Sequence, residues 1–392
     1  MAGSIAAPSR FSRLPLYIGG LMGPLGTGIM VPMIPELRQE FSTSNSVLAW
    51  GWALYLVPFA ALMLVSGTLS ERWGRRRTAR WSFLLYAVVS VLCAAAPTLG
   101  LFFAGRAVAG ALNAFFTPIL LAALADATPT ERLGEVVGVY AGFQSFGSLL
   151  APLTGGLAAD VNWRLAFVLV AGASFMLSWF PPPGDPRVDI EPLPTRPLRQ
   201  RPLRLLGVAA FAAGAGPIGV AVVVGLEARD ELGLSGSAAG FVLMAGPAAA
   251  MFAGRAWGRV LDRVGGRRAS VAAYLICSAL VAAMAGASTA VVLAAVWAVA
   301  GFSTNFIVVS IQSVAAAALP ANRAGAISFV LAHRFLGHAV GALVWFPVFA
   351  VSPAAAFVGS GTVGLLGVGA VYASGLGTRS EQPLGRELGA GA

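Results

Sequence analysis

The chain has 392 residues, of which 57% are hydrophobic and only 11% are charged, and its formal net charge is +10. A soluble domain carries roughly 25% charged residues, so this composition excludes a water-soluble protein and places most of the chain in a lipid bilayer. The basic residues are all arginine and fall beside apolar stretches. The positive charge therefore indicates membrane orientation and not nucleic-acid binding.

Apolar stretches recur twelve times along the chain, and a bilayer-spanning helix needs about 20 apolar residues. They predict an all-α membrane protein with spans at 15–35, 48–69, 80–97, 99–124, 136–158 and 163–181, and at 204–226, 237–258, 269–287, 289–317, 325–350 and 353–376. The proline- and charge-rich segment 182–203 is predicted to be a linker. The resulting domains are an N-terminal segment, a six-helix bundle, the linker, a second six-helix bundle and a tail, at 1–14, 15–181, 182–203, 204–376 and 377–392.

An eleven-residue motif follows the second span and returns 191 positions later, after the eighth. Two halves built alike are typical of transporters that arose by duplication. We expect acid–arginine pairs in the motif to hold one conformation and to release in another; alternatively, its arginines only fix topology. The candidate gating residues are Gly67, Glu71, Arg72, Gly74, Arg75, Arg76, Gly258, Asp262, Arg263 and Arg267.

The fourth span carries a polar stripe. Arg106, Gly110, Asn113 and Thr117 follow the spacing of one helix face. A charge inside the bilayer is costly, so Arg106 is expected to face a cavity or a partner. The Arg-x-x-x-Gly pattern that it begins resembles a fourth-helix motif of membrane transporters that is associated with proton coupling, and this resemblance makes Arg106 a coupling candidate. The alternative is an arginine that reaches the membrane interface from near a helix end.

The fifth span contains small residues at close intervals and one proline. Small residues let helices approach closely, and proline bends a helix axis. The motif residues are Gly147, Ala151, Pro152, Gly155 and Gly156.

The eleventh span carries His333, Arg334 and His338 as further coupling candidates. Histidine titrates near neutral pH and could carry a proton; the alternative is that both histidines are hydrogen-bonded inside the bundle. The spans contain no acid, so neither a metal site nor a cofactor is expected. The two cysteines, Cys93 and Cys277, predict no disulfide.

Arginines are distributed unequally between the two sides of the predicted membrane. The termini, the even-numbered connections and the linker hold 20, and the opposite side holds only Arg38, Arg164 and Arg229. Cytoplasmic loops are rich in arginine. Both termini are therefore expected in the cytoplasm, in a multi-pass protein of the cell's inner (plasma) membrane.

The repeated motif, the Arg-x-x-x-Gly of the fourth span and the small-residue run of the fifth together resemble the major facilitator superfamily, most closely its 12-helix drug–proton antiporters. The resemblance covers about 15–376. It implies two six-helix bundles related by a pseudo-two-fold axis, with a cavity lined mainly by helices 1, 4, 7 and 10. Candidate substrate-binding residues are Thr27, Tyr55, Asn113, Tyr140, Gln144, Asn305 and Gln312; the alternative for each is interhelical hydrogen bonding.

The resemblance implies proton-coupled efflux of a small drug-like or apolar molecule by a monomer. The first span contains no acid, unlike many drug–proton antiporters of the family, and this favours a neutral or anionic substrate. Uptake or exchange of a metabolite such as a sugar or organic acid is an alternative within transport. A non-transporting sensor or scaffold is an alternative from another class, and an enzyme is not expected because the spans hold no nucleophile–base set.

Overall fold

The computed structural model describes residues 10–129, 132–184 and 200–376, and within these ranges every regular element is a helix. The fold class predicted from the sequence is confirmed. The terminal segments and the linker lie largely outside the described residues. Where the chain is described, the first helix begins at residue 10 and the helix after the linker at residue 201.

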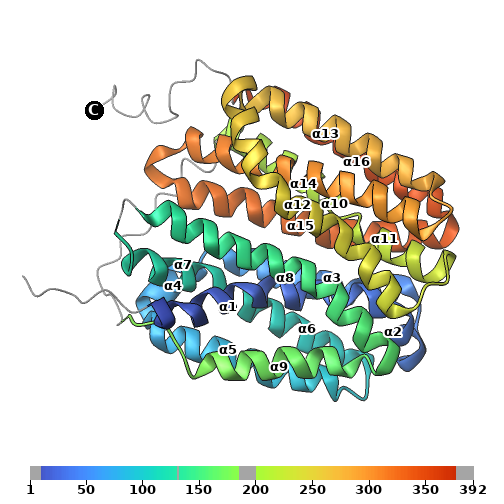
Figure 1. Cartoon of the computed structure of the whole chain (residues 1–392), viewed down its shortest axis with the longest axis horizontal. Coiled ribbons are helices and arrows are strands. Elements are labelled where there is room, and N and C mark those ends of the chain that lie inside the picture. Colours follow the sequence, from blue (N-terminus) through green and yellow to red (C-terminus); the bar gives the residue numbers. More distant parts are fainter. Residues whose placement is uncertain (1–9, 130–131, 185–199, 377–392) are drawn as a thin grey trace, which may run out of the picture.

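Within its described residues, the first half contains ten helical elements (Figure 1). They are α1 (Arg10–Gly28), η1 (Val31–Met33), α2 (Ile34–Glu40), α3 (Asn45–Met63), α4 (Ser66–Trp73), α5 (Arg75–Ala94), α6 (Leu99–Asn113), α7 (Phe116–Asp126), α8 (Leu133–Val161) and α9 (Arg164–Ser178).

The second half has a similar series of helices. They are α10 (Arg201–Ala215), α11 (Ala221–Leu226), the π-helical turn η4 (Glu227–Glu231), α12 (Gly236–Val264), α13 (Gly266–Ala283), η5 (Met284–Gly286), α14 (Ala290–Ala318), η6 (Pro320–Asn322), α15 (Arg323–Val351) and α16 (Pro353–Ser374). Each of the twelve predicted spans is occupied by one helix or by consecutive helices.

Side-chain caps explain where several of the long helices begin. Ser44, Thr98, Thr289 and Ser352 precede α3, α6, α14 and α16, and each hydroxyl accepts a hydrogen bond from the backbone amide three residues later. Such caps satisfy one of the amide groups left free at a helix start. The boundaries of these helices are thus encoded locally.

Eight helical segments of the described chain are long and apolar enough to cross a membrane, and α9 and the first part of α12 are shorter apolar helices. The two other predicted spans depart from this pattern for visible reasons. Helix α5 begins with three arginines, and the seventh span is divided between α10 and α11. The count of twelve is consistent with these helices.

The halves lie side by side, with α1–α9 in one and α10–α16 in the other (Figure 1). Two long helix pairs join them, α3 with α15 and α8 with α12. Large apolar side chains such as Met176, Phe252 and Leu366 are exposed on the surface. In a membrane protein such side chains face lipid tails.

The repeated motif has the same backbone conformation in both halves. Gly74 precedes α5 with a φ angle of 87°, and Gly265 precedes α13 with the same φ angle of 87°. Residues with a Cβ rarely adopt this conformation, which explains the glycine at both positions. The duplicated sequence therefore folds into a duplicated turn.

Candidate functional site

Arg106 on α6 lies inside the first half and is only 2% exposed. Its Nη1 donates a hydrogen bond of 3.1 Å to the carbonyl oxygen of Gly26 on α1. Its guanidinium carbon lies 4.1 Å from the centre of the Tyr55 ring on α3, a cation–π contact. The Nε atom has no hydrogen-bond partner among the described residues. The side chain thus points between helices and does not reach toward a helix end.

Asn113 extends this polar network along the same face of α6. Its Nδ2 donates a hydrogen bond of 2.8 Å to the hydroxyl of Tyr55 and one of 3.4 Å to the carbonyl oxygen of Gly23. The Tyr55 hydroxyl also lies 3.2 Å from that of Tyr86 on α5. A Cβ on Gly110 would collide with the backbone of Tyr55, so this glycine allows α6 to approach α3. Arg106, Gly110 and Asn113 of the predicted stripe therefore face α1 and α3. Thr117 departs from the prediction, because α6 ends at Asn113 and Thr117 lies on α7, where it bonds α8.

The remaining polar candidates of the first half make local contacts. Thr27 donates to the Gly23 carbonyl of its own helix at 2.9 Å. Gln144 on α8 donates 3.1 Å to Thr117 on α7. The Tyr140 hydroxyl is buried without a hydrogen-bond partner among the described residues. These contacts include the interhelical hydrogen bonds that were the alternative to substrate binding.

The small residues of α8 bring three helices together. A Cβ on Gly147 would meet the backbone of α1 at Leu21, and one on Gly155 would meet it just beyond the end of α1. Ala151 lies against Gly28 of α1, and Pro152 and Gly156 contact α12. The motif therefore sets the distance between α8 and α1 and also the distance between the two halves.

Gly156→Val is expected to reduce transport strongly and to lower thermal stability. A Cβ there would collide with the Gly236 carbonyl and lie 3.2 Å from the Cα of Gly240, so α8 and α12 would have to separate. Overpacking of this kind costs about 1–3 kcal/mol. Gly142→Val is the matched control on the same helix, because nothing lies within 4 Å of a Cβ there. Equal flux and equal melting temperatures for the two variants would contradict this role.

In the second half, the coupling candidates lie on α15. The His333 Nδ1 lies 2.8 Å from the Phe329 carbonyl of the preceding turn, and the His338 Nε2 is buried without a described partner. The Arg334 guanidinium lies 4.5 Å from the centre of the Phe335 ring. The Phe335 ring also meets Phe59 of α3 edge-on at 4.8 Å, so this helix reaches the junction of the halves.

The two candidates on α14 have different environments, although the sequence places them on one helix face. Asn305 donates 2.7 Å to the Ala250 carbonyl of α12. Gln312 lines a cavity together with Arg334. Asn305 therefore joins two helices, whereas Gln312 lies between α10, α14 and α15 beside Arg334.

The first copy of the repeated motif forms ion pairs within its own half. Arg75, 5% exposed, contacts both Glu71 of the preceding helix and Asp126 at the end of α7. Burial lowers the pKa of Arg75, but its bonds to these two carboxylates outweigh burial and raise it. Arg72 and Arg76 are exposed. The motif thus ties α4, α5 and α7 together, and its gating role stays a prediction.

The second copy makes a different contact. Arg267 on α13 donates a hydrogen bond of 3.0 Å to the backbone carbonyl of Tyr372 on α16. Its guanidinium carbon also lies 4.1 Å from the centre of the Tyr372 ring. Arg263 is exposed on the last turn of α12. Gly258 lies within α12, and the side chain of Asp262 lies outside the described part of the structure.

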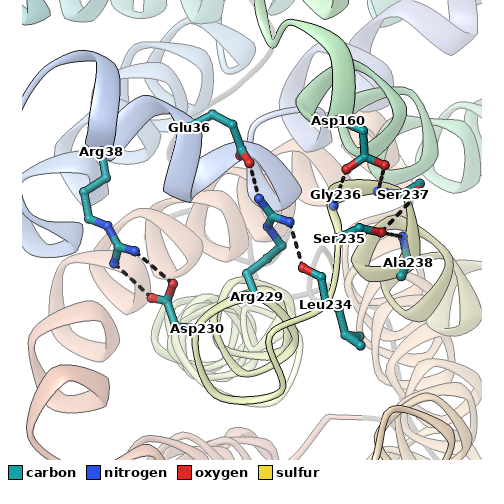
Figure 2. Close-up of polar contacts among 10 residues, drawn as sticks. All are labelled: Glu36, Arg38, Asp160, Arg229, Asp230, Leu234, Ser235, Gly236, Ser237 and Ala238. Atoms are coloured by element: carbon teal, nitrogen blue, oxygen red, sulfur yellow. Dashed lines mark hydrogen bonds and ion pairs between the residues drawn. The ribbon is translucent and has the colours of Figure 1, made fainter.

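Polar residues from both halves meet at the opposite end of the bundle (Figure 2). Arg38 makes two bonds of 3.2 Å to the Asp230 carboxylate. Asn45 adds a third bond to this carboxylate, of 2.8 Å. Arg229 contacts Glu36 and donates 2.7 Å to the Leu234 carbonyl. We call the set Glu36, Arg38, Asn45, Asp160, Arg229 and Asp230 the clasp.

Asp160 completes the clasp from the end of α8. Its two carboxylate oxygens accept bonds of 2.6 and 2.9 Å from the backbone amides of Gly236 and Ser237, at the start of α12 (Figure 2). A helix N-terminus attracts an anion because its amides are unsatisfied and its dipole is positive. The clasp therefore joins α2, α3 and α8 of one half to η4 and α12 of the other.

Sequence reasoning did not identify the clasp, although it contained a signal. The three arginines on the arginine-poor side are Arg38, Arg164 and Arg229, and each is paired with an acid. Arg164 pairs within its own half with Glu40, at 2.7 Å. Thus each arginine on the arginine-poor side of the membrane is neutralised by a carboxylate in the folded protein.

Glu227 lies beside the clasp, at the junction of α11 and η4. Its Oε2 is buried without a hydrogen-bond partner among the described residues. Burial raises the pKa of this carboxyl, and the neighbouring Glu231 raises it further. Glu227 thus holds a proton more readily than an ordinary carboxyl group.

Comparison with known proteins agrees with this architecture. The family model described as Major Facilitator Superfamily matches residues 16–342. The fold is similar to the crystal structure of a bacterial homolog of the human lysosomal transporter Spinster, in an inward-facing and unoccupied conformation. The TM-score is 0.71 at 17% identity, over 95% of this chain and 96% of that one. At this identity the likeness shows the fold alone.

Curated relatives match over part of their length. The uncharacterized MFS-type transporter EfpA of Mycobacterium tuberculosis is 30% identical over 166 residues, 41% of this chain and 31% of that protein. The class H tetracycline resistance protein of Pasteurella multocida is 28% identical over 155 residues, 38% of each. The drug efflux pump JefA of M. tuberculosis is 28% identical over 162 residues, which are 41% of this chain and 32% of that protein. Each match spans well under half of the relative. From the family match and the helical architecture, the chain belongs to the major facilitator superfamily and is a multi-pass membrane protein.

Proposed function

We propose that the protein exports small drug-like organic molecules by alternating access, driven by protons. The observation that carries this proposal is the clasp, because it joins the two halves at one end through side-chain contacts that can be broken and remade. Two halves that rock about a central site need such contacts to stabilise one closed state. The helix pairs α3–α15 and α8–α12 are the surfaces on which the halves would move.

Export is supported by the small-residue motif of α8 and by the relatives whose names describe drug efflux and tetracycline resistance. The arginine distribution supports an inner membrane location with both termini in the cytoplasm. In this orientation the clasp closes the extracellular end, and the repeated motif lies at the cytoplasmic end.

Proton coupling is supported by Glu227. It is a half-buried carboxyl with a raised pKa next to residues that must separate when the extracellular end opens. Protonation would remove its charge as the clasp rearranges. The polar network around Arg106 would then hold the helices that line the central site.

Flux of tetracycline into proteoliposomes tests the function. A gradient of one pH unit is worth about 1.4 kcal/mol, so it can sustain about a tenfold accumulation, which a protonophore should abolish. Glu227→Gln is expected to retain binding but lose the dependence on the gradient, whereas Glu231→Gln keeps it. Flux that ignores the protonophore would refute coupling. Absence of flux for tetracycline and for a panel of drug-like compounds would favour a sensor or scaffold.

A further inference from the structure

We propose that the open hollow at the start of α5, lined by Trp73, Arg76, Arg77, Arg80 and Trp81, binds the phosphate head group of an anionic phospholipid. We call this space the arginine hollow. The assignment concerns a lipid partner of the protein and does not depend on transport, on its substrate or on its direction.

The arginine hollow lies where α4 ends and α5 begins, at the turn of the first copy of the repeated motif. Its volume is about 470 Å³, which is within the range of about 300–1,000 Å³ that is usual for small-molecule sites. Three arginines and two tryptophans form its wall, together with Gly74 and Gly184. The space is therefore large enough for a phosphate and the groups esterified to it.

The three arginines of the hollow make no ion pair and no side-chain hydrogen bond within the described part of the chain, and all three are exposed. By contrast, Arg75 on the same turn contacts both Glu71 and Asp126. No acid is among the described residues that line the hollow. Three unpaired guanidinium groups around one space attract an anion, and arginine can bind two phosphate oxygens at once.

The tryptophans place the hollow at the boundary between lipid and water. Trp73 and Trp81 are 53% and 51% exposed, and tryptophan is enriched at this boundary because its ring is apolar and its N–H group is polar. Trp73 stacks on Phe115, with the ring centres 6.1 Å apart. One wall of the hollow is thus held in place by the folded protein.

An apolar stripe on α5 leads from the hollow along the membrane-facing side of the helix. Leu85, Val88 and Leu92 follow Trp81 at the spacing of one helix face, and each is between 43% and 49% exposed. The buried side of α5 packs against α6 and α9. A lipid whose phosphate occupies the hollow would lay its acyl chains beside this stripe, whereas a soluble anion would use only the arginines. The continuity favours a phospholipid over free phosphate.

The second copy of the motif lacks this arrangement, although its turn has the same φ angle. Val264 and Ala272 stand where the first copy has its tryptophans, and Val271 stands where it has its third arginine. Arg267, the counterpart of Arg76, bonds α16. The hollow is therefore not a general consequence of the motif, and one such lipid site is expected in each chain.

Lipid binding to the purified full-length protein in detergent tests the assignment, with native mass spectrometry to count the bound lipids. The probes are dioleoylphosphatidylglycerol, which is anionic, and dioleoylphosphatidylcholine, which has the same chains and no net charge. The first phosphatidylglycerol is expected to bind at least about tenfold more tightly, since each basic residue near an anionic lipid surface contributes a factor of about five. The full-length chain is used so that acids of the linker, such as Asp185, compete for the arginines.

Two variants with equal loss of charge separate the hollow from general attraction to a basic protein. The first removes the charges of the hollow by Arg76→Gln, Arg77→Gln and Arg80→Gln. The matched control removes three exposed charges elsewhere by Arg201→Gln, Arg204→Gln and Arg268→Gln. The first variant should lose the preference for phosphatidylglycerol, and the control should keep it. Trp81→Ala keeps the net charge and removes one wall, so phosphatidylglycerol should bind to it severalfold more weakly.

Equal binding of the two lipids by the wild type would overturn the assignment. An equal loss of preference in both triple variants would also overturn it, because charge alone would then explain the binding. Displacement of the lipid by an equal concentration of glycerophosphoglycerol, the same head group without chains, would assign the hollow to a soluble phosphate ester instead. If the triple variant of the hollow fails to fold, the wild-type comparison and Trp81→Ala still decide.

Discussion

Arg106→Ala is expected to reduce transport strongly while leaving folded protein in the membrane. The guanidinium is the charged centre of the network that joins α1, α3 and α6. Its removal leaves the Gly26 carbonyl without this donor and the Tyr55 ring without its cation. Losing the partner of a buried polar group destabilises the network by about 1–3 kcal/mol. This loss should reduce flux by about tenfold or more, because each 1.4 kcal/mol is a factor of ten. Flux in proteoliposomes is the measurement.

Two controls make the result specific. Arg204→Ala removes an exposed arginine on α10 and should transport like the wild type. Asn113→Asp should also impair transport, because it replaces the donor that bonds Tyr55 with an acceptor. Thermal unfolding establishes that each variant is folded. Wild-type flux through Arg106→Ala would show that the buried arginine is only structural.

Asp230→Asn is expected to open the end of the bundle that the clasp closes. The Asp230 carboxylate accepts bonds from both Arg38 and Asn45, and a neutral amide would replace these charge-assisted bonds with weaker ones. A loss of about 1–2 kcal/mol would shift the closed–open equilibrium by about five- to thirtyfold. A single cysteine at Ala239, which is buried in the first turn of α12, should then react faster with a membrane-impermeant thiol reagent.

The matched control for Asp230→Asn is Glu231→Gln, which makes the same chemical change at the neighbouring, exposed acid. The native Cys93 and Cys277 are replaced by alanine in every variant so that only position 239 reacts. Exchanging the charges, Arg38→Asp with Asp230→Arg, should restore slow labelling. If Asp230→Asn is labelled as slowly as the wild type, the clasp does not hold the closed state.

The sequence predicted local features well because they depend on composition and nearby residues. Apolar stretches predicted twelve spans, and each of them is occupied by a helix or by consecutive helices in the structure. The repeat itself was visible in the sequence, and its glycines Gly74 and Gly265 adopt the same unusual φ angle. The stripe from Arg106 to Asn113 follows helical spacing, so its common face was predictable, and the structure places that face against α1 and α3.

Contacts between distant segments were not predictable from a single sequence. Tyr86 gives no signal in an apolar span, and only the packing of α5 and α3 against α6 brings its hydroxyl to Tyr55. Asn305 and Gln312 share a helix face by spacing, yet one bonds α12 and the other lines a cavity. Helical periodicity determines which residues face the same way, but it does not determine which helix they face.

The sequence by itself determined that this protein is a helical membrane protein with two similar halves, because burial in lipid imposes apolar spans about 20 residues long. Only the tertiary structure decided which charges meet. Arg38 and Asp230 are hydrogen-bonded although they lie 192 positions apart in the sequence, and no local pattern connects them. Their pairing follows from the docking of one half on the other, which depends on the shape of the whole α3–α15 and α8–α12 interface.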